Sequence, residues 1–268
     1  MGTGGRISRI AVIGGSAMEE LPVSREIGSL ETPYGRSSEV FLVRLGDKHV
    51  LFMPRHGADH SLPPHRVNYR ANIWALKELG VERIVATNAV GAINPSMRPG
   101  DLVVPHDLMD FTKLRATTFY DEPPVTHVDV SQVYCPEVRE ALIEACRMVG
   151  VRFWDHGVLF CTEGPRFETP AEIRMFRLLG ADLVGMTGFP EPVLARELGM
   201  CYATLCFVSN MAAGLQDRVS VEEVLRIGER VRGEVVKVLV GAIPKIPERR
   251  GCPCARALES ARFGGRGC

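Results

Sequence analysis

Short apolar runs of strand length alternate along this chain with longer amphipathic stretches, and this alternation constrains the fold more than any other feature. It is typical of an α/β sheet that is covered by helices. One stretch has a clear helix start, because Thr169 supplies an N-cap oxygen and Pro170 takes the first helical position. The pattern predicts strands at residues 7–13, 49–53, 83–86, 156–161, 182–186 and 201–208, and helices at 67–79, 136–149, 169–179, 190–198 and 220–240.

The size and charge of the chain narrow the class of protein. Its 268 residues suit one large domain, with two small domains as the alternative. The 32 basic and 32 acidic residues balance, which argues against a nucleic-acid binder and means that an anion must be held by local donors. No apolar run reaches the roughly 18–20 residues that span a membrane. Residues 1–9 do not resemble a signal peptide, so we expect a cytoplasmic protein that is not bound to a membrane.

Small and polar residues follow almost every predicted strand. In open α/β sheets, ligands bind outside the carboxyl ends of the strands, so these clusters can converge on one pocket. The clusters are Gly14-Gly15-Ser16, Pro54-Arg55-His56-Gly57, Thr87-Asn88-Ala89-Val90-Gly91, Thr187-Gly188 and Ser209-Asn210.

Two of these clusters suit an anion. The glycines before Ser16 let backbone amides approach a ligand closely, although a plain tight turn is the alternative. Arg55 offers a fork of donors that matches phosphate oxygens and His56 adds more, although a surface pair is the alternative.

No metal site is predicted. His56, His60 and His65 are close in sequence, but the glycine and prolines between them prevent their presentation on one helix face. No other group of histidines and cysteines has zinc-ligand spacing.

Two residues before the helix at 169–179 suit a planar base. Phe167 can stack on it, with core packing as the alternative. Glu168 can bind it, with a role as an acidic first-turn group of the helix as the alternative.

Taken together, these motifs resemble the trimeric purine nucleoside phosphorylases, and among them the methylthioadenosine phosphorylases. The resemblance covers about residues 7–247. It implies a single-domain phosphorylase fold over 1–247, with a mixed central sheet and a distorted barrel flanked by helices, followed by a basic, cysteine-containing tail at 248–268. It rests on Ile13-Gly14-Gly15-Ser16, Pro54-Arg55-His56-Gly57, Val67-Asn68-Tyr69-Arg70-Ala71-Asn72, Glu163-Gly164-Pro165-Arg166-Phe167 and Gly185-Met186-Thr187.

The resemblance also implies roles for individual residues. Phe167, Met211 and Ala212 would line the base pocket, and Met186 would pack under the ribose. His127 would reach the 5′ end of the nucleoside in the site of a neighbouring subunit. At position 88 the methylthioadenosine enzymes usually carry threonine, so Asn88 is a departure. Phosphate would be held by Ser16, Arg55, His56, Asn88, Ala89 and Thr187.

Positions 168, 210 and 212 indicate which purine is used. Adenine-selective relatives carry aspartates at the last two positions and a small residue at the first, whereas this chain has Asn210, Ala212 and Glu168. A carboxylate accepts the N1–H of a 6-oxopurine, and an amide NH₂ can meet its O6 and N7. The pattern therefore predicts a 6-oxopurine phosphorylase in which Asn210, Glu168 and His56 are catalytic. An adenine-selective methylthioadenosine phosphorylase, a hydrolase and a non-catalytic nucleoside-binding subunit are the alternatives.

The 5′ substituent is less constrained. Val221, Val224 and Leu225 open the last helix with apolar side chains, which favour a methylthio group over a hydroxyl. This combination resembles methylthioinosine phosphorylases and leaves inosine and guanosine open as substrates. Ordinary helix packing is the alternative role for Val221.

The resemblance implies a homo-oligomer, either a trimer or a dimer of trimers, and the long irregular segment 104–134 is consistent with an interface. It implies no organic cofactor and no metal, since inorganic phosphate is the co-substrate. Cys252-Pro253-Cys254 resembles a tail motif of thermophilic relatives, for which it implies a disulfide. Two free surface thiols are the alternative.

Overall fold

One large sheet forms the centre of the part of the chain that the structure describes. The computed structural model describes residues 9–15, 21–259 and 261–262. The large sheet has 11 strands, and β3 and β4 form a separate hairpin. The strands are β1 (Ile10–Gly14), β2 (Val23–Gly28), β3 (Glu31–Thr32), β4 (Gly35–Arg36), β5 (Val40–Leu45), β6 (Lys48–Pro54), β7 (Arg83–Ala92), β8 (Leu102–Val103), β9 (Asp107–Phe111), β10 (Phe153–Trp154), β11 (Val158–Thr162), β12 (Leu183–Gly185) and β13 (Cys201–Met211).

Four parallel strands occupy the middle of this sheet. They run in the order β13, β7, β1 and β6, and nearly all of their residues are buried. Continuous burial is expected for parallel strands that have helices on both faces. The antiparallel strands β5 and β2 extend the sheet beyond β6, so the sheet is mixed.

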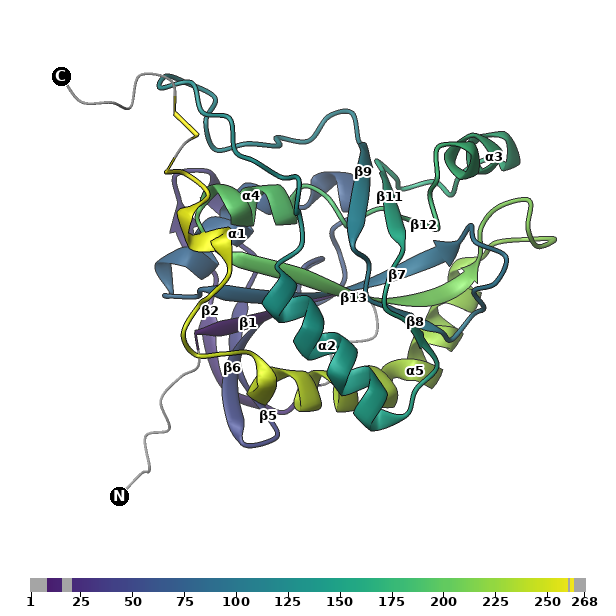
Figure 1. Cartoon of the computed structure of the whole chain (residues 1–268), viewed down its shortest axis with the longest axis horizontal. Helices are drawn as coiled ribbons and strands as arrows, with labels where there is room; N and C mark the ends of the chain where they lie inside the picture. Colours follow the sequence, from purple (N-terminus) through teal and green to yellow (C-terminus); the bar gives the residue numbers. More distant parts are fainter. Residues whose placement is uncertain (1–8, 16–20, 260, 263–268) are drawn as a thin grey trace.

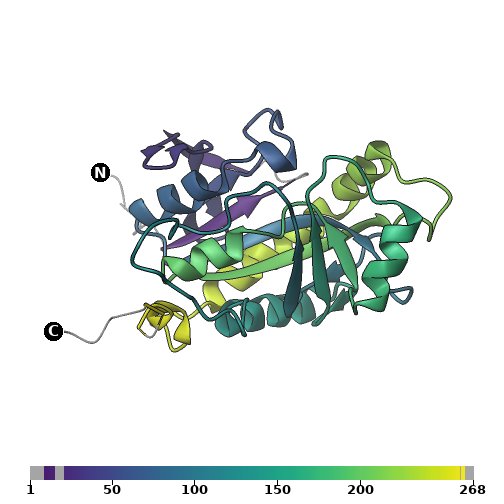
Figure 2. The ribbon, with the colours of Figure 1, turned by 90° about the horizontal axis from the view of Figure 1, so that it is seen from above.

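Helices cover both faces of the sheet. Figures 1 and 2 show α2 and α5 side by side along one face and α1 with α4 on the other. The predicted helices are confirmed to within about two residues at each end. The helices are α1 (Tyr69–Glu78), α2 (Pro136–Val149), α3 (Pro170–Leu178), α4 (Glu191–Glu197) and α5 (Val221–Ala242), and the short 3₁₀ turns are η1 (Pro64–Arg66), η2 (Ile243–Lys245) and η3 (Pro253–Arg256).

One end of the sheet closes into a distorted barrel. From β7 the pairing continues to β13 and β8 on one side, and through β12 and β11 to β9 on the other. β8 and β9 follow one another in a single bent segment. This segment pairs first with β10 and then with β11, so the branch through β8 and the branch through β9 meet and close the barrel. A small apolar cluster built from these strands fills the space between them: Val90, Ala92, Met97, Val103, Leu159, Leu183, Cys206 and Val208.

Two strands are longer than predicted. β7 continues to Ala92 and β13 to Met211, so the polar clusters at 87–91 and 209–210 lie within strands rather than after them. Their polar side chains are tolerated because they bond to one another and to the backbone, as Thr204 does with Asn88 and Ser209 does with the carbonyl of Val90. The strands β2 and β5 were not predicted, because exposed residues interrupt their apolar pattern.

Residues 248–259 of the tail pack against the domain. Residue 254 lies in η3, and Cys252 and Cys254 are 8% and 1% exposed, so the expected alternative of surface thiols is wrong. Near the other end of the tail, residue 262 bridges to Thr126 in the long segment before α2.

No helix in the described part of the chain is both long enough and apolar enough to cross a membrane.

Candidate active site

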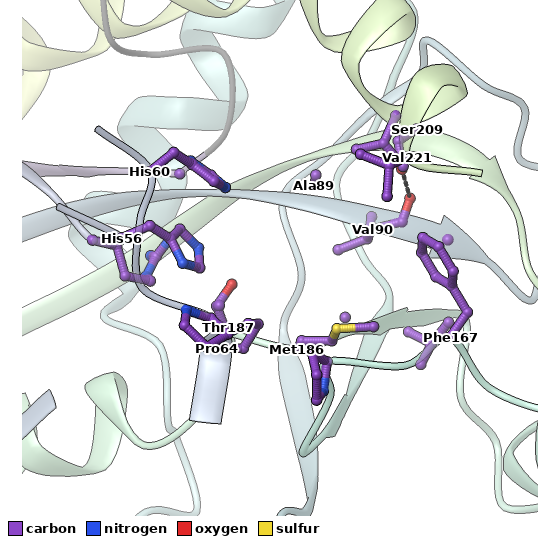
Figure 3. Close-up of a pocket in the computed structure, with 18 of the residues that line it drawn as sticks. His56, His60, Pro64, Ala89, Val90, Phe167, Met186, Thr187, Ser209 and Val221 are labelled. Atoms are coloured by element: carbon purple, nitrogen blue, oxygen red, sulfur yellow. Dashed lines mark hydrogen bonds between the residues drawn. The ribbon is translucent and has the colours of Figure 1, made fainter. Parts of the chain in front are cut away.

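A cavity of about 400 Å³ opens where β1 and β6 end and where β7, β12 and β13 pass beside them. A concave site at the carboxyl ends of parallel strands is the usual place for a small ligand in an α/β fold. Figure 3 shows His56 and His60 toward one end, Phe167 and Val221 toward the other, and Met186 between Thr187 and Phe167. The predicted residues that line this cavity are Arg55, His56, Ala89, Phe167, Glu168, Met186, Thr187, Asn210, Val221 and Val224.

A buried ion pair underlies the histidine end of the cavity. Arg55 has no exposed surface, and its Nε and Nη2 donate to the two carboxylate oxygens of Glu191 at 2.6 and 2.9 Å. Tyr202 donates its hydroxyl to the same carboxylate at 2.7 Å. Burial works to lower the pKa of Arg55, but Glu191 outweighs it and holds the pKa above its ordinary value. The guanidinium is therefore permanently charged and fixed in place.

The third nitrogen of Arg55 faces the glycine turn after β1. Nη1 donates to the carbonyl of Thr87 at 3.0 Å, and a side chain at Gly15 would have to stand only 3.1 Å from Nη1. A guanidinium has five N–H groups, and three of them are used by Glu191 and Thr87. The predicted phosphate contact of Arg55 therefore depends on the remaining N–H groups. Ser16, the next predicted phosphate ligand, lies outside the described residues.

His56 is neutral in this environment. Its Nδ1 lies 2.8 Å from the carbonyl of Leu62, which can only accept, so Nδ1 carries the proton and donates. Burial, together with the charge of Arg55, lowers the pKa of His56 to about 4. Nε2 is then an acceptor for an acidic proton such as the P–OH of a phosphate, whereas the sequence analysis treated His56 as a donor.

Thr187 is oriented by a chain of hydrogen bonds from the sheet. Thr204 donates to Asn88 Oδ1 at 2.6 Å, which turns the Asn88 amide so that Nδ2 donates to the Thr187 hydroxyl at 2.7 Å. The Thr187 oxygen accepts this bond, so its own proton is available for an anion in the cavity. Asn88 is 2% exposed and does not line the cavity, so it acts through Thr187.

At the other end of the cavity, Glu168 is available for a ligand because α3 is capped without it. Thr169 and Glu172 form a complete capping box at the start of α3. The alternative role of Glu168 as a first-turn group is therefore not needed. Its carboxylate accepts from the Thr162 hydroxyl at 2.8 Å, and burial raises the pKa of Glu168 above its ordinary value.

A bulge in β13 shapes the position of Asn210. The register between β13 and β7 shifts between Val208 and Asn210, which turns the following side chains. Asn210 Nδ2 donates to its neighbouring carbonyl at 2.8 Å and keeps a second N–H. The side chain sits over Gly91, where an added Cβ would lie 3.1 Å from Nδ2, so glycine leaves the room that this amide needs.

Besides Asn88, four of the predicted residues do not line the cavity. Met211 packs against the apolar cluster inside the barrel, and Ala212 is buried in a separate cluster beside α3. Side chains alternate along a strand, so Asn210 and Met211 face opposite sides. His127 is exposed in the segment before α2, where its backbone N–H bonds to the carbonyl of Ala261. Leu225 lies one turn beyond Val221 and is 57% exposed.

Several residues that hold the site together were not predicted. Arg115 is the clearest case, because its buried guanidinium donates to the carbonyls of Thr162, Glu163, Met186 and Phe189. These bonds fix the Met186–Phe189 backbone against the backbone of Thr162 and Glu163. Glu191, Tyr202 and Thr162 were also missed, and Thr87 was predicted only as part of a cluster. The partners of Glu191 and Arg115 lie far away in the sequence, so neither spacing nor periodicity marks these two residues.

Comparison with known proteins identifies the family. The model of the family described as "Phosphorylase superfamily" matches residues 9–244. The chain belongs to the phosphorylase superfamily. Its substrates are accordingly a nucleoside and phosphate, and the predicted α/β phosphorylase fold is confirmed.

Named relatives cover almost the whole chain. A probable S-methyl-5′-thioinosine phosphorylase of Methanopyrus kandleri is 53% identical over 95% of this chain and 99% of its own. A 6-oxopurine nucleoside phosphorylase of Pyrococcus furiosus is 50% identical over 94% of this chain and 98% of its own. Among solved structures, a methylthioadenosine phosphorylase from Schistosoma mansoni in complex with adenine superposes with a TM-score of 0.88, at 31% identity, over 96% of this chain and 99% of that one.

The lowered pKa of His56 predicts a pH dependence of stability. The unfolded chain takes up a proton at this residue near its ordinary pKa of 6.5, whereas the folded phosphorylase does so only near 4. Stability is therefore lost as the pH falls through this window. In urea unfolding, the wild type should lose about 2 kcal/mol more than His56→Asn between about pH 7 and about pH 4.5. Asparagine keeps a donor for the Leu62 carbonyl but does not titrate, and equal losses in both proteins would contradict the assignment of a neutral His56.

Proposed function

We propose that this phosphorylase acts in the cytoplasm in purine salvage, where it phosphorolyses inosine, guanosine or 5′-methylthioinosine. The products are the free 6-oxopurine and ribose 1-phosphate or its methylthio analogue. One observation carries the proposal: Glu168 and Asn210 line the same cavity as Phe167. The relatives of Methanopyrus kandleri and Pyrococcus furiosus, at 53% and 50% identity, are named for thioinosine and 6-oxopurine substrates, which supports it.

The donor and acceptor pattern of the base favours this assignment. An ionised Glu168 accepts the N1–H of a 6-oxopurine, and the Asn210 amide donates to O6 or N7. Adenine presents a lone pair at N1, which an ionised Glu168 repels. A site that is built to pair one particular N–H can discriminate by about 10⁴, because the wrong base leaves buried polar groups unpaired.

Phosphate binds at the opposite end of the cavity. Arg55 supplies the fixed positive charge, the Thr187 hydroxyl donates to an oxygen, and His56 Nε2 accepts from a P–OH. These contacts place the anion next to Met186, which is the predicted floor under the ribose. Fixing both reactants in this way removes most of the entropy cost of bringing them together.

The reaction is a displacement at C1′ with inversion. A phosphate oxygen forms a bond to C1′ while the C1′–N9 bond breaks and N9 keeps the electron pair. The purine leaves as an anion or takes up a proton at N7. Glu168 at N1 and Asn210 at N7 stabilise the charge that moves into the base. No side chain forms a covalent intermediate.

Exchange of the base-binding residues tests the proposed specificity. The double substitution Glu168→Ser with Asn210→Asp should lower kcat/KM for inosine by at least about 100-fold and raise it for methylthioadenosine. Both substrates are assayed with and without inorganic phosphate. An unchanged preference for inosine in the double variant would show that the base site is assigned wrongly, and turnover without phosphate would indicate a hydrolase.

The 5′ group of the nucleoside meets the start of α5. Val221 and Val224 line the cavity there, and Val221 is 62% exposed, so it does not serve ordinary helix packing within this chain. An apolar contact at this position favours a methylthio group.

Val221→Ser tests this contact. We expect it to lower kcat/KM for methylthioinosine about tenfold more than for inosine, because the contact of one apolar side chain is lost. Leu225→Ser is the matched control, since it lies on the same helix outside the cavity, and it should leave the ratio unchanged. Equal losses on both nucleosides in Val221→Ser would contradict the apolar 5′ site.

A trimer or a dimer of trimers completes the proposal. Apolar side chains are exposed along the segment before α2, where Phe111, Leu114 and Val125 are 46%, 86% and 53% exposed. The same segment carries His127, which we place at the 5′ end of the nucleoside in a neighbouring subunit.

Light scattering tests the assembly. The wild type should have three or six times the mass of one chain. Leu114→Glu would bury a charge in the proposed subunit interface, so it should dissociate the assembly. Activity should be lost at the same time, because each site would lose the His127 of its neighbour. Leu178→Glu introduces the same charge at an exposed position on α3 and should change neither mass nor activity. A fully active monomer would contradict the proposal.

A further inference from the structure

Four cysteine thiols meet far from the cavity, at the point where the tail reaches the sheet. Cys135 is the N-cap residue of α2 and Cys201 begins β13, whereas Cys252 and Cys254 flank Pro253 at the start of η3. All four are at least nine-tenths buried, and none lines the cavity. Their Sγ atoms all lie within 4.8 Å of one another, and Cys201 Sγ is 3.4 Å from Cys252 Sγ.

These separations suit a tetrahedral metal centre. A zinc ion holds its thiolates at about 2.3 Å, which places the sulfurs of a tetrahedron about 3.8 Å apart. The observed range brackets that value. Four sulfur donors without an open position are typical of a structural zinc site.

Two guanidinium groups with little exposed surface lie near the cluster. Arg196 is 5% exposed and donates to the carbonyl of Gln132, and its charge acts on both the Asp129 carboxylate and Cys254. A second buried guanidinium, that of Arg83, lies 3.8 Å from Cys201 Sγ and pairs with Glu137.

We propose that Cys135, Cys201, Cys252 and Cys254 bind one zinc ion as four thiolates and thereby fasten the tail to the sheet. Zinc with four thiolates carries two net negative charges, and the positive charges of Arg196 and Arg83 lie close enough to stabilise them. Binding displaces the thiol protons into solvent and changes no oxidation state. The site is structural, because the cavity and its residues do not touch it.

No metal was predicted from the sequence, because the four cysteines do not have zinc-ligand spacing. Only Cys252 and Cys254 are neighbours in sequence, and the fold supplies the other two from elements 51 and 117 residues earlier than Cys252. A disulfide within the tail motif is the competing state of the same thiols.

Metal analysis of the full-length phosphorylase tests the proposal. The protein is purified anaerobically without added reductant or chelator, and zinc is counted by mass spectrometry after gel filtration. We expect about one zinc per chain in the wild type and in Cys146→Ala, and a loss of at least about tenfold in Cys254→Ala. Cys146 is the matched control because it is a fully buried cysteine on α2 outside the cluster. Iron or no metal in the wild type would overturn the zinc site.

Two further measurements keep the test decisive if Cys254→Ala fails to fold. In denaturant with a chelator, the zinc protein should show all eight thiols of the chain, whereas two disulfides in the cluster would leave four. Cobalt(II) replacing zinc in the wild type should give the intense absorption of a tetrahedral thiolate centre. Fewer than eight thiols, or no such absorption, would overturn the proposal.

The role of the site has its own readout. Removal of zinc should lower the Tm by roughly 10 °C while leaving KM for inosine and phosphate unchanged at a temperature where the protein stays folded. An unchanged Tm after complete removal of zinc would overturn the structural role.

Discussion

The site of this phosphorylase depends on the ion pair between Arg55 and Glu191. It joins the end of β6 to the start of α4, 136 positions apart in the sequence, in a place with no access to water. Burying two charges is costly, and the cost is offset here by a bidentate geometry and by the Tyr202 hydroxyl and the Thr87 carbonyl, which satisfy further hydrogen-bonding groups. The fold thereby keeps a permanent positive charge beside the cavity without leaving it free to move.

The two ends of the cavity are supported by different parts of the sheet. At the proposed phosphate end, Arg55, His56 and Thr187 are held by the parallel centre and by hydrogen bonds that run through Asn88 to Thr204. At the proposed base end, the residues belong to the barrel and to the loop before α3. Arg115 joins the two, because it binds the carbonyls of Met186 and Phe189 together with those of Thr162 and Glu163 on the neighbouring segment.

The parts of this structure that follow from local chemistry could be predicted. The helices at α3 and α5 begin at the N-cap residues Thr169 and Ser220, and the core strands are continuous apolar runs. Arg55, His56, Ala89 and Asn210 were found because they lie at or near the end of such a run, whereas the role of Met186 came from the family resemblance. The roles that depend on long-range partners could not be found in this way. Glu191, Arg115 and the meeting of Cys252 and Cys254 with Cys135 and Cys201 arise only when distant elements come together. His56 was expected to donate to the ligand. Its proton is instead on Nδ1, which donates to the Leu62 carbonyl, so Nε2 faces the ligand as an acceptor.

The capping of α3 has a consequence for how such enzymes diverge. Thr169 and Glu172 stabilise the helix by themselves, so position 168 contributes to the choice of base but not to the start of the helix. A mutation there can change the preferred purine at little expense in folding free energy. Opposite it, the bulge in β13 already interrupts the regular ladder at Asn210, so a new side chain at that position does not have to fit an ideal strand. Lineages that share this scaffold are therefore free to exchange one nucleobase for another through few steps, while the phosphate end stays constrained by its buried charges.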